Sequence, residues 1–206
     1  MLKLYYMPGT CALASHIALE QAGVPYEAIR VDFAKSEQRA SAYLAINPKG
    51  RVPSLVTDRG VLTETPAILV FIAQSHPAAK LAPVDDPFAL AEAQAFNSYL
   101  CSTVHVAHAH RMRGPRWSEE PAVIEGMKRG VAKSVSAAFD LIERGMLKGP
   151  WVLGESYSIC DPYLFTLAQW VEADGVDTAK LPRVMEHRRR VAELPAVRKA
   201  LAAERA

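Results

Sequence analysis

The spacing of hydrophobic and polar positions changes near residue 80, and this change divides the chain into two halves. In the first half, alternating or aromatic runs at residues 2–7 and 26–33 predict strands. Between them, residues 12–21 carry apolar side chains at helical spacing, and Gly23 provides a stop. In the second half the spacing is helical almost throughout, which predicts helices at 88–111, 119–146, 158–173 and 187–204.

The rest of the first half predicts a hairpin and a further helix. Residues 35–46 predict a short helix or an irregular loop, and the runs VPSLV and VLTE flank the turn TDRG. Pro53 is not compatible with an ordinary interior strand, because proline has no N–H to donate. A helix is expected from Thr65-Pro66 to about Ser75. The order β-α-β-α-β-β-α indicates a small α/β domain.

Three prolines mark the junction between the halves. Pro77, Pro83 and Pro87 fall within a short stretch of the chain, as is typical of a linker. We therefore predict an α/β domain over residues 1–78, a linker over 79–87 and an all-helical domain over 88–206.

Charge and composition exclude several classes of protein. A net charge of +2 is too balanced to indicate nucleic-acid binding or attachment to a membrane surface. No apolar run is long enough to span a membrane, and the chain enters a strand without a leader-like segment. The three cysteines are far apart and odd in number, which favours a reducing compartment. We expect a cytoplasmic protein.

Cys11 lies where the first strand meets the first helix, and two interpretations are open. Free cysteines are usually buried as small apolar residues. At a helix N-terminus, however, unpaired N–H groups and the helix dipole favour a thiolate, which predicts a depressed pKa. Position 14 is alanine, so the chain has no C-x-x-C dithiol here. A reactive Cys11 would need a second sulfur from elsewhere, and glutathione is the abundant candidate.

The first helix of the second half is not expected to hold a metal site. Cys101, His105 and His108 follow the spacing i, i+4, i+7, which places them on one helix face. No acidic residue or cysteine pair completes a tetrahedral set at the spacing of a structural zinc site. A histidine lining a cleft between the domains is the better interpretation.

Four motifs in order give the chain a resemblance to a known family. The segments YYMPGTC, NPKGRVPSL, LTETPAI and SICDPYLF resemble a bacterial cytosolic glutathione S-transferase, with the beta class most similar. The resemblance covers nearly the whole chain. It implies a thioredoxin-like α/β domain followed by an all-α domain, glutathione as co-substrate, and a homodimer.

The resemblance assigns roles to individual residues. Cys11 corresponds to the cysteine that contacts the glutathione sulfur, and His105 to a histidine that faces it. Tyr6 corresponds to a first-strand tyrosine that bonds the thiolate in other classes, although it can equally be a core aromatic residue. Lys35 lies near the lysine that holds the glycine carboxylate of glutathione, offset by about one residue.

The peptide-binding part of the site is implied around the hairpin. Val52 and Pro53 correspond to the valine before a cis-proline, where the backbone pairs with glutathione by strand addition. Glu64 and Thr65 correspond to the acid–hydroxyl pair that holds its γ-glutamyl end. Alternatively, Val52-Pro53 is simply the edge of a sheet. Thr65-Pro66 can also be read as a helix cap followed by proline at the first helical position.

A structural role is predicted for the motif SICDPYLF. Ser158 and Asp161 have the spacing of a capping box, which should start a buried helix and take no part in catalysis.

The sequence thus predicts a glutathione S-transferase that conjugates its thiol to small hydrophobic electrophiles or exchanges it with disulfides. Tyr163 and Trp170 are candidates for lining the electrophile site. A disulfide-bond reductase or a reductive dehalogenase on the same fold is the alternative. A non-catalytic ligand-binding or interaction protein is a third possibility, since fold does not fix function.

Overall fold

Four strands form the sheet on which the first half is built. In the computed structural model, which describes residues 1–205, they are β1 (Leu2–Tyr6), β2 (Tyr26–Arg30), β3 (Ser54–Thr57) and β4 (Gly60–Thr63). The strand order is β2-β1-β3-β4. β1 runs parallel to β2 and antiparallel to β3, and β3 and β4 form the predicted hairpin.

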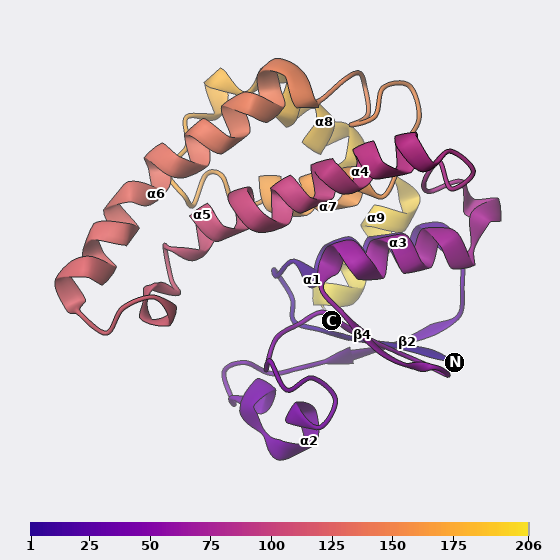
Figure 1. Cartoon of the computed structure of the whole chain (residues 1–206), viewed down its shortest axis with the longest axis horizontal. Helices are drawn as coiled ribbons and strands as arrows, with labels where there is room; N and C mark the ends of the chain where they lie inside the picture. Colours follow the sequence, from indigo (N-terminus) through magenta and orange to yellow (C-terminus); the bar gives the residue numbers. More distant parts are fainter. Residues whose placement is uncertain (206) are drawn as a thin grey trace.

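Helices cover the two faces of this sheet unequally (Figure 1). The parallel pair β1 and β2 needs a crossover, which α1 (Ala12–Ala22) provides. α1 and α3 (Thr65–Ser75) lie together on the face that looks toward the second half. The short α2 (Ser41–Leu44) lies on the opposite side.

α1 is enclosed on all sides. Every residue from Ala12 to Leu19 is buried, because the helix packs against α3, α7 (Cys160–Ala168) and α9 (Pro195–Arg205). A helix that is apolar all round is expected only where no face meets solvent. The start of α1, where Cys11 lies, is therefore fixed by both halves of the molecule.

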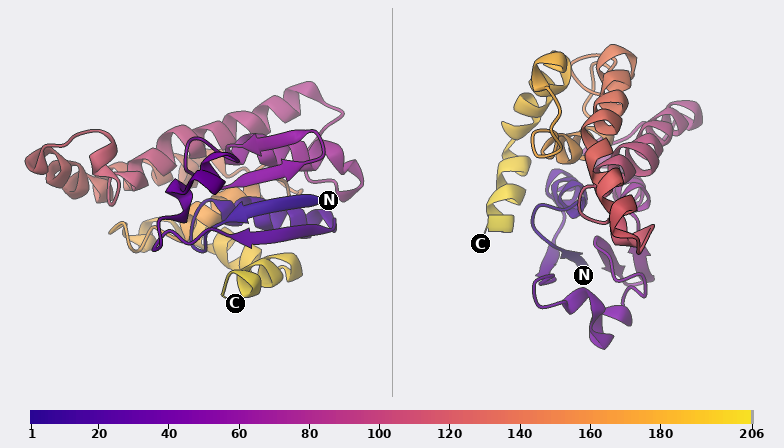
Figure 2. Two further views of the ribbon diagram at one scale, coloured as in Figure 1. Left: turned by 90° about the horizontal axis from the view of Figure 1, so that it is seen from below. Right: turned by 90° about the vertical axis from the view of Figure 1, so that its left-hand side faces the viewer.

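The second half is a set of helices that crosses above the sheet (Figures 1 and 2). α4 (Pro87–Tyr99) continues through a π-helical segment, Leu100–Val104, into α5 (His105–Ala109). α6 (Pro121–Leu141) likewise continues into a π-helical segment, Ile142–Met146. The chain also forms α8 (Pro182–Ala192) and short 3-10 turns at Glu37–Arg39, Pro77–Ala79, Gly114–Arg116 and Thr178–Lys180.

The predicted fold class, an α/β half followed by an all-helical half, is confirmed. α3 ends at Ser75 and α4 begins at Pro87, so the change of architecture falls between these two residues. The division into domains at 1–78 and 88–206 remains our proposal. Within residues 1–205, no helix has both the length and the hydropathy that crossing a bilayer requires.

The prediction of one helix over residues 187–204 is wrong. The segment belongs to two helices, α8 and α9, separated at Glu193–Leu194. Pro195 explains the break, because proline lacks the N–H for an interior helix bond and disfavours helical backbone at the preceding residue. α8 also starts earlier than predicted, at Pro182, which suits the first turn of a helix.

The second strand is shorter than the predicted 26–33. β2 ends at Arg30, and Asp32 then starts a turn by accepting hydrogen bonds from the N–H groups of Ala34 and Lys35. Aspartate commonly stabilises turns in this way. Phe33 continues the alternating hydrophobic pattern of the sequence, but it lies beyond the end of the strand.

The Asp161 carboxylate makes more hydrogen bonds than the predicted capping box requires. Its carboxylate accepts from the Ser158 N–H at 2.6 Å, as the motif predicts. It also accepts from the Val152 N–H at 2.8 Å and lies 2.9 Å from His187 Nε2 on α8. The fully buried carboxylate therefore joins three separate segments of the second half.

Candidate active site

A cavity of about 630 Å³ is lined by residues of both halves. Six of the eight predicted site residues line it: Cys11, Val52, Pro53, Glu64, Thr65 and His105. The first five come from the α/β half and His105 comes from α5. The volume falls in the range of pockets that hold one or two small molecules.

Cys11 immediately precedes α1, but Thr10 accepts the hydrogen bonds from the first N–H groups of this helix. The Thr10 hydroxyl accepts from the Ala12 N–H at 3.3 Å, and its carbonyl accepts from the Leu13 N–H at 3.2 Å. The Ala14 N–H donates to the Cys11 carbonyl. These N–H groups, which we expected to be free to stabilise a thiolate, are therefore already bonded.

The prediction of a depressed Cys11 pKa is wrong in direction. Burial raises the pKa of the Cys11 thiol, and the Thr65 hydroxyl and the Arg113 guanidinium oppose this only in part. The thiol donates to the Val52 carbonyl at 3.6 Å, a bond that only the protonated form can make. In the free protein Cys11 is a neutral thiol that faces a cavity.

The backbone before Pro53 is held open toward the cavity. The Val52–Pro53 peptide bond is cis, and within residues 1–205 no protein group accepts from the Val52 N–H. Two side chains that sequence reasoning missed fix this loop: the Tyr43 hydroxyl and the Asn47 amide both donate to the Arg51 carbonyl. Buried polar side chains clustered around one loop are the signal that could have identified them.

Glu64 and Thr65 lie where α3 begins, though not in the capping arrangement we considered. Glu64 is the cap residue and Thr65 is the first helical residue, so the Thr65 hydroxyl is not the helix cap. Glu64 has φ 72°, a left-handed conformation that costs energy in a residue with a side chain. Its carboxylate pairs with Lys49, which also donates to the Thr63 hydroxyl at 2.7 Å.

His105 faces the cavity from α5, beside aromatic groups. Its ring centroid lies 5.3 Å from that of Trp170, and the His108 ring stacks on Trp170 at 4.1 Å. Burial, with the nearby Arg113 and other cations, lowers the pKa of His105 to about 4. His105 is therefore neutral near pH 7, and its ring can accept a hydrogen bond.

Tyr6 and Lys35 are not among the residues that line the cavity. The Tyr6 hydroxyl points toward α9, where it lies 3.5 Å from the Ala203 carbonyl, and burial raises its pKa. Lys35 is exposed and pairs with Asp32 at 3.6 Å. The lysine that the structure places beside Glu64 is Lys49, from the NPKG segment.

The loop that carries Cys11 is tied to the last helix. The Gly9 N–H donates to the Glu204 carboxylate at 3.1 Å, and His16 Nδ1 of α1 lies 3.6 Å from the same carboxylate. Glu204 is only 8% exposed. Gly9 also lines the cavity, so its hydrogen bond to Glu204 connects α9 to the site.

Further lining residues come from the second half. Tyr163 and Trp170, the two candidates named from sequence, both line the cavity. Cys101 lines it as well, from the π-helical segment, so two of the three cysteines face one space. His108 is held by Asp174 at 2.7 Å, and within residues 1–205 no group of three or more ligating side chains could hold a metal ion.

Comparisons with known proteins agree with this architecture. Residues 1–74 match the model of the glutathione S-transferase N-terminal domain. Glutathione S-transferase GstA of Escherichia coli O157:H7 is 32% identical over 206 residues, which cover 98% of both chains.

Two solved structures extend the likeness to three dimensions. A glutathione transferase homologue from Sulfitobacter with bound glutathione superposes with a TM-score of 0.95 at 45% identity, covering 98% of each chain. A beta-class enzyme from Sphingomonas chungbukensis gives a TM-score of 0.86 at 32% identity, again over 98% of each chain. On the sequence identity, the shared fold and the cavity at the start of α1, the chain belongs to the glutathione S-transferase family.

Proposed function

We propose that this protein binds glutathione in the cavity and transfers its sulfur to small electrophiles or exchanges it with disulfides. The observation that carries the proposal is that Cys11, Val52, Glu64 and Thr65 line one cavity, opposite His105. Binding of glutathione measured by calorimetry tests it. Absence of binding would instead favour a non-catalytic role for the fold.

Each part of glutathione has a chemically suitable partner. The Val52 N–H has no acceptor in the part of the chain that the structure describes, so it can pair with the extended peptide as in strand addition. The Glu64 carboxylate can accept from the γ-glutamyl ammonium, with the Thr65 hydroxyl beside it. Arg51, which directly precedes Val52, also lines the cavity and can receive the glycine carboxylate. For Lys35, only the family resemblance supports a contact with the glycine carboxylate of glutathione.

Two reactions are available at this site. In conjugation, the glutathione sulfur loses its proton and forms a bond to an electrophilic carbon, whose leaving group departs with the electron pair. In exchange, the Cys11 thiolate attacks a disulfide and forms a mixed disulfide, releasing a thiolate. The neutral Cys11 thiol can donate a hydrogen bond in the first reaction and must ionise for the second.

His105 is proposed to accept a hydrogen bond from the glutathione thiol and so to position its sulfur, since its lowered pKa leaves it neutral but makes it a weak base. Replacing His105 by Asn should lower kcat by about tenfold, as for the loss of one well-placed hydrogen bond, with a smaller change in KM for glutathione. Steady-state kinetics at saturating electrophile separates the two parameters. A change in KM alone would make His105 a binding residue.

The low pKa also predicts that His105 does not titrate near neutrality. Its ring proton resonance should be constant between pH 6 and 8, because the pKa near 4 lies below this window. A histidine in a model peptide titrates near 6.5. The difference spectrum between wild type and His105→Asn identifies the resonance, and a midpoint above pH 6 would contradict the assignment.

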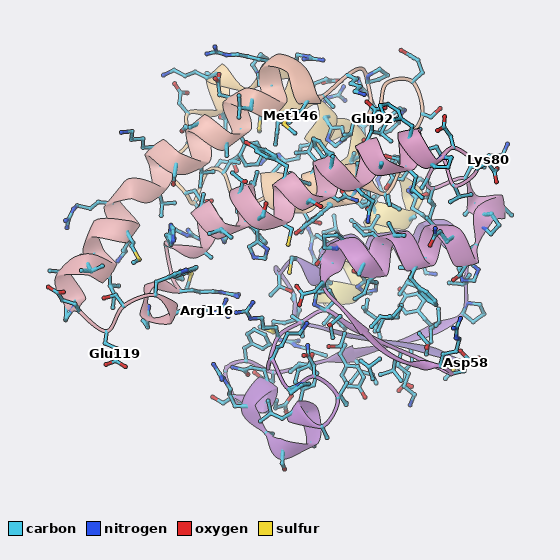
Figure 3. The ribbon with its side chains drawn as sticks, viewed as in Figure 1. Asp58, Lys80, Glu92, Arg116, Glu119 and Met146 are labelled. Carbon is cyan, nitrogen blue, oxygen red and sulfur yellow. The ribbon has the colours of Figure 1, made fainter. Side chains whose placement is uncertain are left out.

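Glu64 is proposed to hold the amino end of glutathione. Replacing it by Ala should weaken binding by about 1.5–3 kcal/mol, as for other hydrogen bonds to a charged group. Glu92 provides a matched control, because it is another exposed glutamate paired with a lysine, Lys148 at 2.7 Å, and it lies on α4 outside the cavity lining (Figure 3). Calorimetry should find the Glu92→Ala affinity unchanged. Equal affinities for both variants would remove Glu64 from the site.

We further propose that the protein is a cytoplasmic homodimer, as the family resemblance implies. Phe88 and Val61, which are 75% and 42% exposed, are apolar side chains that a partner subunit could cover. Sedimentation velocity over a range of concentrations should give twice the chain mass of 22.5 kDa. A single species at the mass of one chain would contradict the proposal.

A further inference from the structure

Three arginines around the cavity have no carboxylate partner. Arg51, Arg113 and Arg116 line it, and none forms an ion pair or a side-chain hydrogen bond within residues 1–205. The one carboxylate in the lining, Glu64, is already paired with Lys49. The cavity therefore has an excess of positive charge that the protein does not balance itself.

Other arginines of the helical half do have acidic partners. On α8, Arg188 pairs with Glu172, and Arg189 and Arg190 pair with Glu186. A fourth arginine of the cavity, Arg111, is also neutralised, by Asp174 at 3.2 Å. Arg113 and Arg116, by contrast, line the cavity without an acidic partner within residues 1–205.

The three guanidinium groups are close enough to affect one another. Burial and the positive charges of Arg113 and Arg51 lower the pKa of Arg116 to about 10. Figure 3 shows Arg116 on the segment between α5 and α6, beyond the end of α5. Like charges held together in this way repel, and a bound anion would relieve the repulsion.

We propose that the electrophile used by this enzyme carries a carboxylate, which Arg113 and Arg116 bind. The inference rests on the proposed function. The contacts proposed for the peptide part of glutathione, Arg51 included, come from the α/β half, and His105 faces only its sulfur. This leaves Arg113 and Arg116 of the helical half for the second substrate. Trp117 and Trp170 line the same cavity and suit an aromatic ring. The substrate class is therefore a small aromatic carboxylate with a leaving group.

A matched pair of electrophiles tests the charge directly. 4-Chloro-3-nitrobenzoate and 4-chloro-3-nitrobenzamide have nearly the same shape, and both lose chloride when the glutathione sulfur bonds to the ring carbon. Each kcat/KM is divided by the rate constant of the uncatalysed reaction, which removes the difference in intrinsic reactivity. We expect the normalised value for the benzoate to exceed that for the benzamide by about tenfold, as for one or two charged hydrogen bonds.

Variants assign this preference to residues. Arg116→Gln and Arg113→Gln should each lower the benzoate-to-benzamide ratio toward one. Arg129 is the control: it is exposed on α6, and within residues 1–205 it has no carboxylate partner and does not line the cavity. Arg129→Gln should therefore keep the ratio. A wild-type ratio of one or less overturns the inference and leaves the proposed function intact. A raised KM for glutathione with an unchanged ratio also overturns it, because the arginines would then serve glutathione.

Binding without turnover separates the inference from the proposed function. Calorimetry with 3-nitrobenzoate and 3-nitrobenzamide needs neither glutathione nor catalysis. We expect the benzoate to bind more tightly, and Arg116→Gln to weaken it by about tenfold. If neither chlorinated compound is conjugated, the proposed conjugation fails while this measurement still decides the inference. Equal affinity for the two nitro compounds overturns it.

Discussion

Replacing Cys11 by Ala is expected to abolish the mixed disulfide with glutathione and to eliminate disulfide-exchange turnover. Exchange needs a protein thiolate at this position, and Cys11 borders both Val52 and Thr65 in the cavity. Conjugation should decrease by less than about tenfold, since its attacking sulfur belongs to glutathione and the variant loses one neutral hydrogen bond. Intact mass spectrometry after incubation with oxidised glutathione gives the first result and kinetics with an aryl halide the second.

The raised pKa of Cys11 adds a pH dependence to this prediction. Because burial shifts the thiol above its ordinary range, little thiolate is present at pH 7. The exchange rate should therefore increase about tenfold per pH unit from pH 6 to pH 8. A rate that levels off below pH 7 would contradict the direction of the shift.

Cys101 provides the control for the same experiments. It lines the cavity, and burial raises its pKa too, but it does not adjoin Val52. Cys101→Ala should retain the glutathione adduct. Loss of the adduct in this variant, together with retention in Cys11→Ala, would transfer the reactive role to Cys101.

Replacing Asp161 by Ala is expected to destabilise the fold by about 3–5 kcal/mol, the range for removing one partner of a buried ionic network. The substitution leaves the Val152 and Ser158 N–H groups and His187 without their acceptor in a fully buried position. Urea denaturation at a fixed protein concentration measures the loss. Glutathione affinity of the folded variant should be unchanged, because Asp161 does not line the cavity.

Asp86 isolates the part of this effect that is due to helix capping. It caps α4 by accepting from the Phe88 and Ala89 N–H groups, but it does so at the surface. Asp86→Ala should therefore cost about 1 kcal/mol. Equal losses of unfolding free energy in the two variants would mean that Asp161 acts only as a helix cap.

The sequence predicted those features that depend on local pattern. The strand before Pro8, the helix starting at Ala12 and the hairpin around Asp58 follow from residue spacing and turn chemistry, and the structure has all three. The break at Pro195 could also have been predicted, because proline constrains the chain locally. The apolar spacing continues on either side of this proline and on its own predicts a single helix.

Features that depend on contacts distant in sequence could not be predicted. The Cys11 pKa is determined by burial under residues from both halves, together with Thr65 and Arg113, and no local motif records that balance. The same holds for Lys49, whose partner Glu64 is fixed by the folding of the hairpin between them. The spacing of Ser158 and Asp161 predicted a cap, while the bonds to Val152 and His187 arise only when α8 packs.

The tie between Gly9 and Glu204 has a consequence for the order in which the protein matures during synthesis. Among the described elements, α9 is the last to leave the ribosome, yet it carries the acceptor for the loop before Cys11. It also covers the side of α1 that carries Leu13 and Ile17. When only the sheet and its helices have left the ribosome, the nascent chain therefore exposes these apolar residues. The loop that carries Cys11 is then not yet fixed. The final turn of α9 must therefore be synthesised before the loop that carries Cys11 can be fixed in place.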